Sequence, residues 1–258
     1  MSTGLTVASF NVLGSSHTVH NGRFASGTRR AGGVARLAQR HDVEVLGFQE
    51  MQSPQLRAFL HRTKGRYDVY PGFALRDLDG ENSLAWDRTE WDALERRTVA
   101  IPYFDGNRRR MPVVKLRNLS TGMSAWFANV HNPATNANHP GQDGWRRRAI
   151  RMEAHLMARL SRSGLPVFLT GDMNEREKAF CPITGRAPMQ AARGGSNRGG
   201  VCHAADPRYV DWVFGHRKVE FHHYRELRGP LVRRTSDHPM VLSEARLDPL
   251  RFPDAFTP

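Results

Sequence analysis

The residues that decide the fold are LPVFLTGDMN, at positions 165–174. The run from 165 to 170 is apolar, contains β-branched side chains and lacks helical spacing, so it predicts a buried strand. The strand ends in Asp172 and Asn174, which share a face because side chains two apart on an extended chain point the same way. A turn after a strand would explain this sequence equally well. The prediction of a functional site therefore depends on partners elsewhere in the chain.

The length and composition predict one large α/β domain. The chain has 258 residues, 39% of them hydrophobic, and no linker divides it. We expect a single domain at residues 1–247 and an irregular tail at 248–258. No run of 18 apolar residues exists, which predicts that nothing spans a membrane. No signal peptide is visible at the N-terminus, so the cytoplasm is the default expectation.

Arginine dominates the charge. The formal net charge is +13, with arginine clusters at residues 29–30, 108–110, 146–148 and 233–234. Guanidinium groups match phosphate geometry, so we expect a polyanionic partner: nucleic acid, a phosphoinositide or an anionic membrane surface. We also expect a monomer. The alternative is that this composition only reflects a GC-rich genome.

The two cysteines, Cys181 and Cys202, lie in residues 175–207, which we predict to be a long loop rich in Gly, Pro and Ser. They can pair in an oxidising compartment, or remain separate thiols in the cytosol. Secretion therefore stays open.

Strands outnumber helices in the hydrophobic pattern. Strands are expected at residues 5–11, 43–50, 67–70, 82–87, 99–104, 111–119, 123–131, 165–170, 209–214, 219–224 and 240–247, and helices at 28–41, 53–63 and 145–160. Several strands follow one another without a helix between them. This order favours a sheet-rich layered α/β or α+β domain over a doubly wound sheet.

Polar residues gather at the ends of these strands and in the loops beside them: Asn11, Glu50, His131, Asp172, Asn174, Asp211, Asp237 and His238. Such strand ends are where α/β sheets usually place their chemistry. Oxygen ligands such as Glu50, Asn11 and Asp237 suit Mg²⁺ or Mn²⁺, and the histidines can act as acid or base. Taken alone, each residue has a structural explanation, such as Asn11 capping a turn.

Six short motifs make the pattern specific. They are FNVLG at 10–14, QE at 49–50, NVH at 129–131, GDMN at 171–174, VDWVF at 210–214 and SDHP at 236–239. In this order they resemble the endonuclease/exonuclease/phosphatase superfamily of metal-dependent phosphoesterases, over nearly the whole chain. That family includes deoxyribonuclease I-like nucleases, sphingomyelinases, inositol-polyphosphate 5-phosphatases and deadenylases. The resemblance implies a four-layer α/β sandwich with two packed mixed sheets flanked by helices.

The resemblance also implies roles for the metal and the attacking water. Glu50 would be the principal ligand of Mg²⁺ or Mn²⁺, helped by Asn11 and Asp237. Asp172 and Asn174 would position or activate the water and touch the phosphate.

The histidines would handle charge and the leaving group. His238 would act as base or charge stabiliser, with Asp211 fixing its ring. His131 would stabilise the transition state or protonate the leaving oxygen, with the carboxylate of Glu81 behind it. Contacts to the substrate are expected from Asn82, Asn129 and Arg146.

The substrate is the least determined feature. The net charge of +13 favours a nucleic-acid backbone, and therefore a nuclease. His131 stands where abasic-site endonucleases of the superfamily carry tyrosine, which argues against that branch. One alternative is a phosphatase or phospholipase acting on an inositol phosphate, a lipid or another small phosphoester. A second is a non-catalytic nucleic-acid-binding module, although a dead homologue would have no reason to keep all the site residues.

Overall fold

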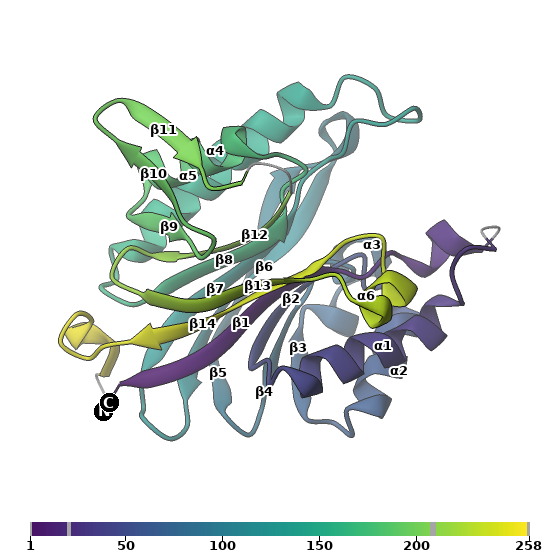
Figure 1. Ribbon diagram of the computed structural model, residues 1–258, viewed down its shortest axis with the longest axis horizontal. Coiled ribbons are helices and arrows are strands. Elements are labelled where there is room, and N and C mark those ends of the chain that lie inside the picture. The colour runs from purple at the N-terminus through teal and green to yellow at the C-terminus, as the bar shows by residue number, and fades with distance from the viewer. Residues whose placement is uncertain (1, 20–21, 207–209, 257–258) are drawn as a thin grey trace.

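Two six-stranded mixed sheets pack face to face in the computed structural model, which describes residues 2–19, 22–206 and 210–256 (Figure 1). The first sheet has the order β13-β14-β1-β2-β4-β3, and the second β5-β6-β7-β8-β12-β9. The first sheet contains β1 Thr3–Asn11, β2 Val45–Gln49, β3 Tyr67–Tyr70, β4 Leu84–Asp87, β13 Glu220–Leu227 and β14 Met240–Leu247. The second contains β5 Trp91–Pro102, β6 Arg108–Asn118, β7 Ser124–His131, β8 Val167–Asp172, β9 Met189–Ala191 and β12 Asp211–His216.

Helices cover the outer faces of both sheets, which completes the expected four-layer sandwich (Figure 1). The first sheet carries α1 Gly27–Arg40 and α2 Ser53–Arg62, with the short α6 Pro230–Thr235 beside α1, while the short α3 Asp77–Gly80 lies at the edge of the sandwich against β6. The second carries α4 Asp143–Ser161 and α5 Glu177–Arg186. A small hairpin, β10 Gly195–Arg198 with β11 Val201–Ala204, stands beside α5. None of the helices in the described residues is long and apolar enough to cross a membrane.

Alternation along β1 explains the layers. Leu5 and Val7 belong to the core between the sheets, whereas Ala8 and Phe10 belong to the core under α1 and α2. A strand with apolar side chains on both faces must be covered on both, so the sheet lies in the interior of the sandwich.

Most predicted elements are confirmed, but the segment at residues 175–207 is not a loop. It contains α5, β9, β10 and β11. Pro182 lies inside α5, where a proline removes a backbone hydrogen bond and normally ends a helix, so the pattern favoured a loop. α6 was also missed, and Tyr209, expected to begin a strand, lies outside the described residues with Pro207.

The boundaries differ in two further places. The strand expected at 99–104 is the end of a longer strand, β5, which begins at Trp91. The tail at 248–258 packs against the domain as far as it is described, with Phe252 and Ala255 buried in the core between and beside the sheets and a 3₁₀ helix at Pro253–Phe256.

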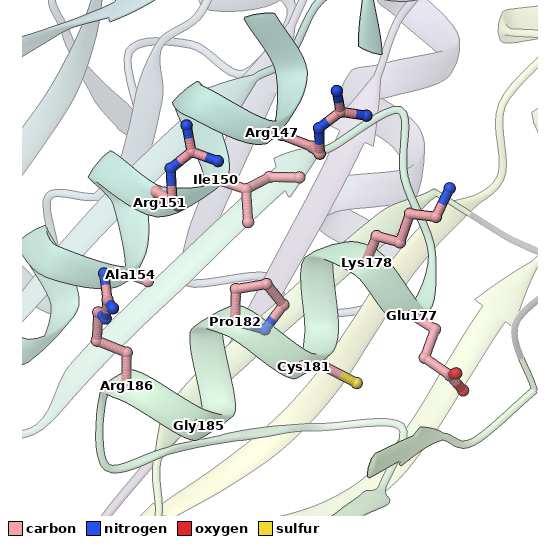
Figure 2. A pocket seen from close by; sticks show the side chains of 10 residues that line it. All are labelled: Arg147, Ile150, Arg151, Ala154, Glu177, Lys178, Cys181, Pro182, Gly185 and Arg186. Carbon is pink, nitrogen blue, oxygen red and sulfur yellow. The ribbon is translucent and has the colours of Figure 1, made fainter. Parts of the chain in front are cut away.

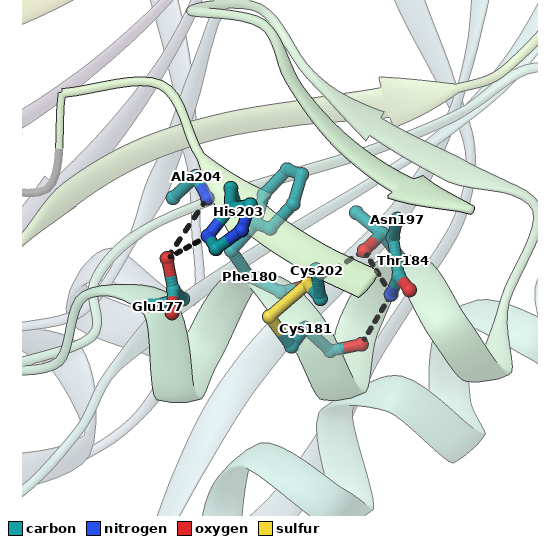
Figure 3. The surroundings of a disulfide bond; sticks show 8 residues. All are labelled: Glu177, Phe180, Cys181, Thr184, Asn197, Cys202, His203 and Ala204. Carbon is teal, nitrogen blue, oxygen red and sulfur yellow. Dashed lines mark hydrogen bonds and ion pairs between the residues drawn. A yellow bond between two sulfur atoms is a disulfide. The ribbon is translucent and has the colours of Figure 1, made fainter. Parts of the chain in front are cut away.

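The two cysteines form a disulfide that joins α5 to β11, with the Cα atoms of Cys181 and Cys202 5.9 Å apart (Figure 3). The hairpin is also held by Asn197, whose Nδ2 donates to the Cys181 carbonyl and to Thr184 Oγ1 at 3.0 Å each. Glu177 Oε2 accepts from the Ala204 amide at 3.3 Å.

Candidate active site

A cavity of about 320 Å³ opens at one edge of the sandwich, where strands of both sheets end. The register brings the polar residues together: His131 pairs with Asp172 across β7 and β8, and Asp172 pairs with Asp211 across β8 and β12. The cavity is lined by Asn11, His17, Glu50, Tyr103, Phe104, His131, Ala134, Asn136, Asn138, His139, Asp172, Asn174 and His238.

Asp211 holds the ring of His238. Both oxygens of the buried Asp211 carboxylate lie 3.0 and 3.1 Å from His238 Nδ1, and His238 Nε2 lies 3.7 Å from Asp172 Oδ2. Burial lowers the pKa of His238, but the carboxylates of Asp211 and Asp172 raise that pKa more, to well above its ordinary value. The two carboxylates therefore favour the protonated form of the imidazole, whose Nε2 faces the cavity residue Asp172.

Asp172 is the centre of the site. Its Oδ2 accepts from Asn11 Nδ2 at 3.1 Å and lies 3.6 Å from His131 Nε2. Its Oδ1 accepts from the Asn174 amide at 2.9 Å. Asn174 is in the left-handed region (φ 47°) and its Nδ2 donates to the Asn132 carbonyl at 2.9 Å, so its backbone turns at the strand end.

Glu50 projects from the neighbouring sheet toward the same amide. Its Oε1 accepts from Asn11 Nδ2 at 3.0 Å, and its Oε2 accepts from the Gly14 amide at 2.8 Å. Burial raises the pKa of Glu50, but His131 and these two donors lower it more, so its pKa lies below the ordinary value. The residue has a left-handed backbone (φ 61°), a strained conformation that turns the chain away from β2.

These groups fit a hard divalent cation. Glu50 and Asp172 are carboxylates held on either side of one carboxamide, Asn11, in one cavity, and such oxygen donors suit Mg²⁺ or Mn²⁺. Asp172, Asp211 and His238 also offer ligand atoms within 4.8 Å of one another, but Asp211 is engaged with the His238 ring. Asp237, predicted as a ligand, is exposed and does not line the cavity.

Asn129 and Arg146, predicted to contact substrate, do not line the cavity. Asn129 is completely buried between the sheets, where Oδ1 accepts from Gln49 Nε2 at 2.7 Å and Nδ2 donates to the Phe48 carbonyl at 2.7 Å. Arg146 is buried too, and its guanidinium donates to the Pro133 carbonyl at 2.8 Å and to other side chains at the base of the loop at residues 132–142. Both residues hold the frame of the site.

Glu81 and Asn82 lie behind the site and do not line the cavity. Glu81 accepts from Gln52 Nε2 at 3.0 Å and from Arg109 Nη1 at 3.2 Å, and in the described part of the chain no hydrogen bond or ion pair joins it to His131. The carboxylate next to His131 is Asp172. Asn82 is completely buried and does not line the cavity, and neither of its side-chain amide atoms has a hydrogen-bond partner in the described structure, so its contact with substrate stays a prediction.

An aromatic wall of the cavity was not foreseen. The His139 ring stacks on Phe104 with centroids 4.0 Å apart, and the edge of Tyr103 meets His131 at 5.5 Å. Asp105 ties the wall together, because its carboxylate accepts from Gln142 Nε2 at 2.8 Å and lies 3.1 Å from His139 Nδ1. The signal available in the sequence was the Asn-, His- and Pro-rich segment that directly follows the NVH motif.

Comparison with known proteins identifies the fold and the family of the chain. No curated protein matches the chain. Among solved structures, an endonuclease/exonuclease/phosphatase family protein from Bacteroides thetaiotaomicron has a TM-score of 0.73 at 20% identity, covering 96% of this chain and 99% of that chain. The mannosyl-6-phosphatase of Bacteroides thetaiotaomicron has a TM-score of 0.72 at 19% identity, covering 93% and 99%. D. rerio TDP2 complexed with single strand DNA product has a TM-score of 0.71 at 16% identity, covering 94% and 99%.

These structural similarities show the fold. The sequence supplies the family, because the model of the Endonuclease/Exonuclease/phosphatase family matches residues 8–238, in agreement with the resemblance found in the motifs. The chain therefore belongs to the Endonuclease/Exonuclease/phosphatase family.

Proposed function

We propose that the protein is a Mg²⁺- or Mn²⁺-dependent phosphodiesterase that cleaves the backbone of nucleic acid. The observation that carries the chemistry is the Asp211–His238 pair facing Asp172 in a cavity shared with Glu50 and Asn11. The net charge of +13 supports a polyanionic substrate. Among the structural relatives, TDP2 is complexed with a DNA product, which supports the same substrate class.

The residues divide the chemistry between them. The protonated His238 ring would donate to a phosphate oxygen and offset the negative charge that develops there, while Asp211 keeps the ring oriented. Asp172, fixed by Asn11 and by the Asn174 amide, would position the attacking water. His131, whose Nε2 lies 3.6 Å from Asp172 Oδ2, would protonate the leaving oxygen.

The same cavity would hold the cation through Glu50, Asn11 and Asp172. A bound divalent ion would supply neutralisation of the phosphate charge. The ionised state of Glu50, whose pKa is held low, suits this role at neutral pH.

A phosphomonoesterase is the second candidate. The cavity of about 320 Å³ is near the lower end of the range for small-molecule sites, so it accommodates one phosphoryl group with a small leaving group. The mannosyl-6-phosphatase among the structural relatives supports this possibility.

The test compares both substrate classes. Supercoiled plasmid, a 20-nucleotide single strand and p-nitrophenyl phosphate would each be incubated with Mg²⁺, Mn²⁺ or EDTA. We expect metal-dependent cleavage of the nucleic acids, reduced by about 10²–10³-fold in His238→Ala. His222→Ala, which removes an exposed histidine on β13, is the matched control and should retain full activity.

Two outcomes would contradict the proposal. Release of phosphate from the monoester alone would favour the second candidate. Full nuclease activity in His238→Ala would reject the role given to that histidine.

A further inference from the structure

A second cavity, of about 630 Å³, lies outside the catalytic cavity in a groove between α4 and α5 (Figure 2). Its floor is apolar, with Ile150 and Ala154 from α4 and Pro182 from α5. Cationic side chains stand along it, from Arg147 and Lys178 near one end to Arg186 at the other. Arg151, one helical turn after Arg147, adds a fourth cation.

Little of the positive charge along this groove is offset by nearby acids, although Arg147 interacts electrostatically with Asp143 on the first turn of α4. Glu177 is the one acidic residue among those that line it, and its Oε2 is engaged with the Ala204 amide and lies 3.6 Å from His203 Nδ1 (Figure 3). In the described part of the chain, no hydrogen bond or ion pair is found for the side chains of Arg147, Arg151 or Lys178. These three cations are therefore available to a ligand.

The position of Lys178 is unfavourable for its own helix. Lys178 is the second residue of α5, near the N-terminus, where the helix dipole disfavours positive charge. Arg147, the fifth residue of α4, lies beyond the first turn and interacts electrostatically with Asp143, four residues earlier. Helix stability therefore does not explain the charge of Lys178, and the N-terminus of α5 adds to the positive potential at this end of the groove.

The cationic end of the groove is next to the catalytic cavity. α4 begins directly after the loop at residues 132–142, which walls that cavity, and α5 begins three residues after Asn174. Arg146 ties both starts together, because it donates to the Pro133 carbonyl and lies 3.4 Å from Glu175 Oε2. The chain segments that begin α4 and α5 therefore connect the catalytic cavity with the end of the groove that carries Arg147 and Lys178.

We propose that the groove between α4 and α5 binds the phosphate backbone of a nucleic-acid strand whose scissile phosphate lies in the catalytic cavity. This inference rests on the proposed function and adds to it a binding track for the polymer. None of the described residues that line the groove is aromatic, so the contacts are to phosphates and not to stacked bases, and binding is independent of sequence.

An anionic lipid surface fits the groove less well. A membrane-binding face projects apolar side chains beyond its charges. Here Ile150 and Ala154 are buried in the floor, at 1% and 0% exposure, and the cations stand above them. A narrow charged chain can reach such a floor, whereas a flat surface cannot.

The test removes three cations from the groove with the triple variant Arg147→Ala/Arg151→Ala/Lys178→Ala. The matched control is Arg148→Ala/Arg159→Ala/Arg162→Ala, which removes the same charge from exposed positions on or just after α4 that do not line the groove. Binding of a fluorescein-labelled 20-nucleotide single strand would be measured by anisotropy in EDTA, between 50 and 200 mM KCl. Hydrolysis of this strand and of bis(p-nitrophenyl) phosphate would be measured with Mg²⁺ or Mn²⁺.

We expect the groove variant to reduce the slope of log affinity against log salt by about 2, since each of three lost phosphate contacts contributes about 0.7 on a single strand. Its kcat/KM for the 20-nucleotide strand should fall at least tenfold, and its kcat/KM for bis(p-nitrophenyl) phosphate should not change. The control variant should behave like the wild type. The single charge reversal Lys178→Glu repeats the binding test in case the triple variant is unstable.

Failure of the groove and failure of the proposed function are distinguishable. The inference about the groove would be overturned if the groove variant kept the wild-type salt slope, or if the control variant lost as much of the slope. Hydrolysis of bis(p-nitrophenyl) phosphate would still uphold the proposed function in that case. If the groove variant lost DNA binding and the wild-type protein hydrolysed neither substrate, the result would support the binding groove and reject the proposed function. Binding to phosphatidylglycerol vesicles but not to the strand would overturn the inference in favour of lipid.

Discussion

The buried carboxyl group of Glu153 allows a direct test of the packing and hydrogen bonding next to the site. It lies on α4 with no exposed surface, and its Oε2 accepts from Asn132 Nδ2 at 3.3 Å. Burial raises the pKa of this carboxyl to about 8, and the Asn132 contact only partly opposes the rise. Glu153 Oε1 and Asn132 Oδ1 are both buried without a hydrogen-bond partner in the described structure. A proton on the acid would give Oε1 a hydrogen to donate, so the protonated form suits this environment.

The sign of the pH dependence follows from linkage. The ordinary pKa of the carboxyl is 4.5, the value expected when the chain is unfolded, and the folded value is about 8. Between these two values the folded state binds more protons, so the free energy of unfolding falls as pH rises. The stabilisation is complete below pH 4.5 and is lost as pH rises through about 8. The full difference corresponds to about 5 kcal/mol, of which about 3 kcal/mol falls between pH 6 and pH 9.

The variant Glu153→Gln keeps the size of the side chain and removes its ionisation. The free energy of unfolding would be measured in urea at pH 6 and at pH 9. We expect the decrease between these two pH values to be about 3 kcal/mol smaller in Glu153→Gln than in the wild type. Glu44, whose pKa burial raises to about 7, contributes equally to both proteins and cancels in the comparison. Glu95→Gln, at an exposed position on β5, is the control and should follow the wild type. Parallel pH curves for Glu153→Gln and wild type would refute the reasoning.

Two further predictions concern the site and the hairpin. Asp211→Asn should lower kcat by about 10²–10⁴-fold at an unchanged melting temperature, because His238 loses the carboxylate that orients its ring and favours the protonated form. Partial recovery of kcat in Asp211→Glu would support a positioning role for Asp211, and wild-type turnover in Asp211→Asn would exclude that role. Cys202→Ser should lower the free energy of unfolding by about 3 kcal/mol, as expected when a loop closed across 21 residues is opened. Intact mass without reductant should show the wild-type protein 2 Da lighter than after reduction, and a free-thiol mass under oxidising conditions would rule the bridge out.

The positions of the strands could be predicted because their apolar pattern is regular and their ends carry recognisable motifs. The same regularity placed Asp172, Asp211 and His238 in one site before any contact was known. The segment containing α5 could not be predicted, because Pro182 argues against a helix when only local preferences are considered. There the core decides, since Phe180 and Ile183 are buried against the second sheet.

The positions of Asn129 and Arg146, away from the cavity lining, could not be predicted for a different reason. A motif tells which residues matter, but not how deep each lies along its strand. Asn129 and His131 are two apart on β7 and share a face, yet only His131 reaches the cavity at the end of the strand. Arg146 lies on the inward side of α4, where the loop before the helix needs hydrogen-bond donors for its carbonyls. Spacing alone does not separate these cases.

The depth along each strand also explains why catalytic and structural residues are neighbours in the same motifs. Gln49 directly precedes Glu50 in the chain, and Asn129 lies two residues before His131. Gln49 and Asn129 form a buried polar layer behind the cavity, in which Gln49 Nε2 donates to Asn129 Oδ1 across the two sheets. The sheets approach closely at this layer, since a Cβ added to Gly47 would lie 2.4 Å from Asn129 Oδ1 and 2.1 Å from Thr170 Oγ1. The layer therefore sets the spacing between the sheet that supplies Glu50 and the sheet that supplies His131. Because the site takes residues from both sheets, a change in this buried layer moves the catalytic groups relative to one another without touching any of them.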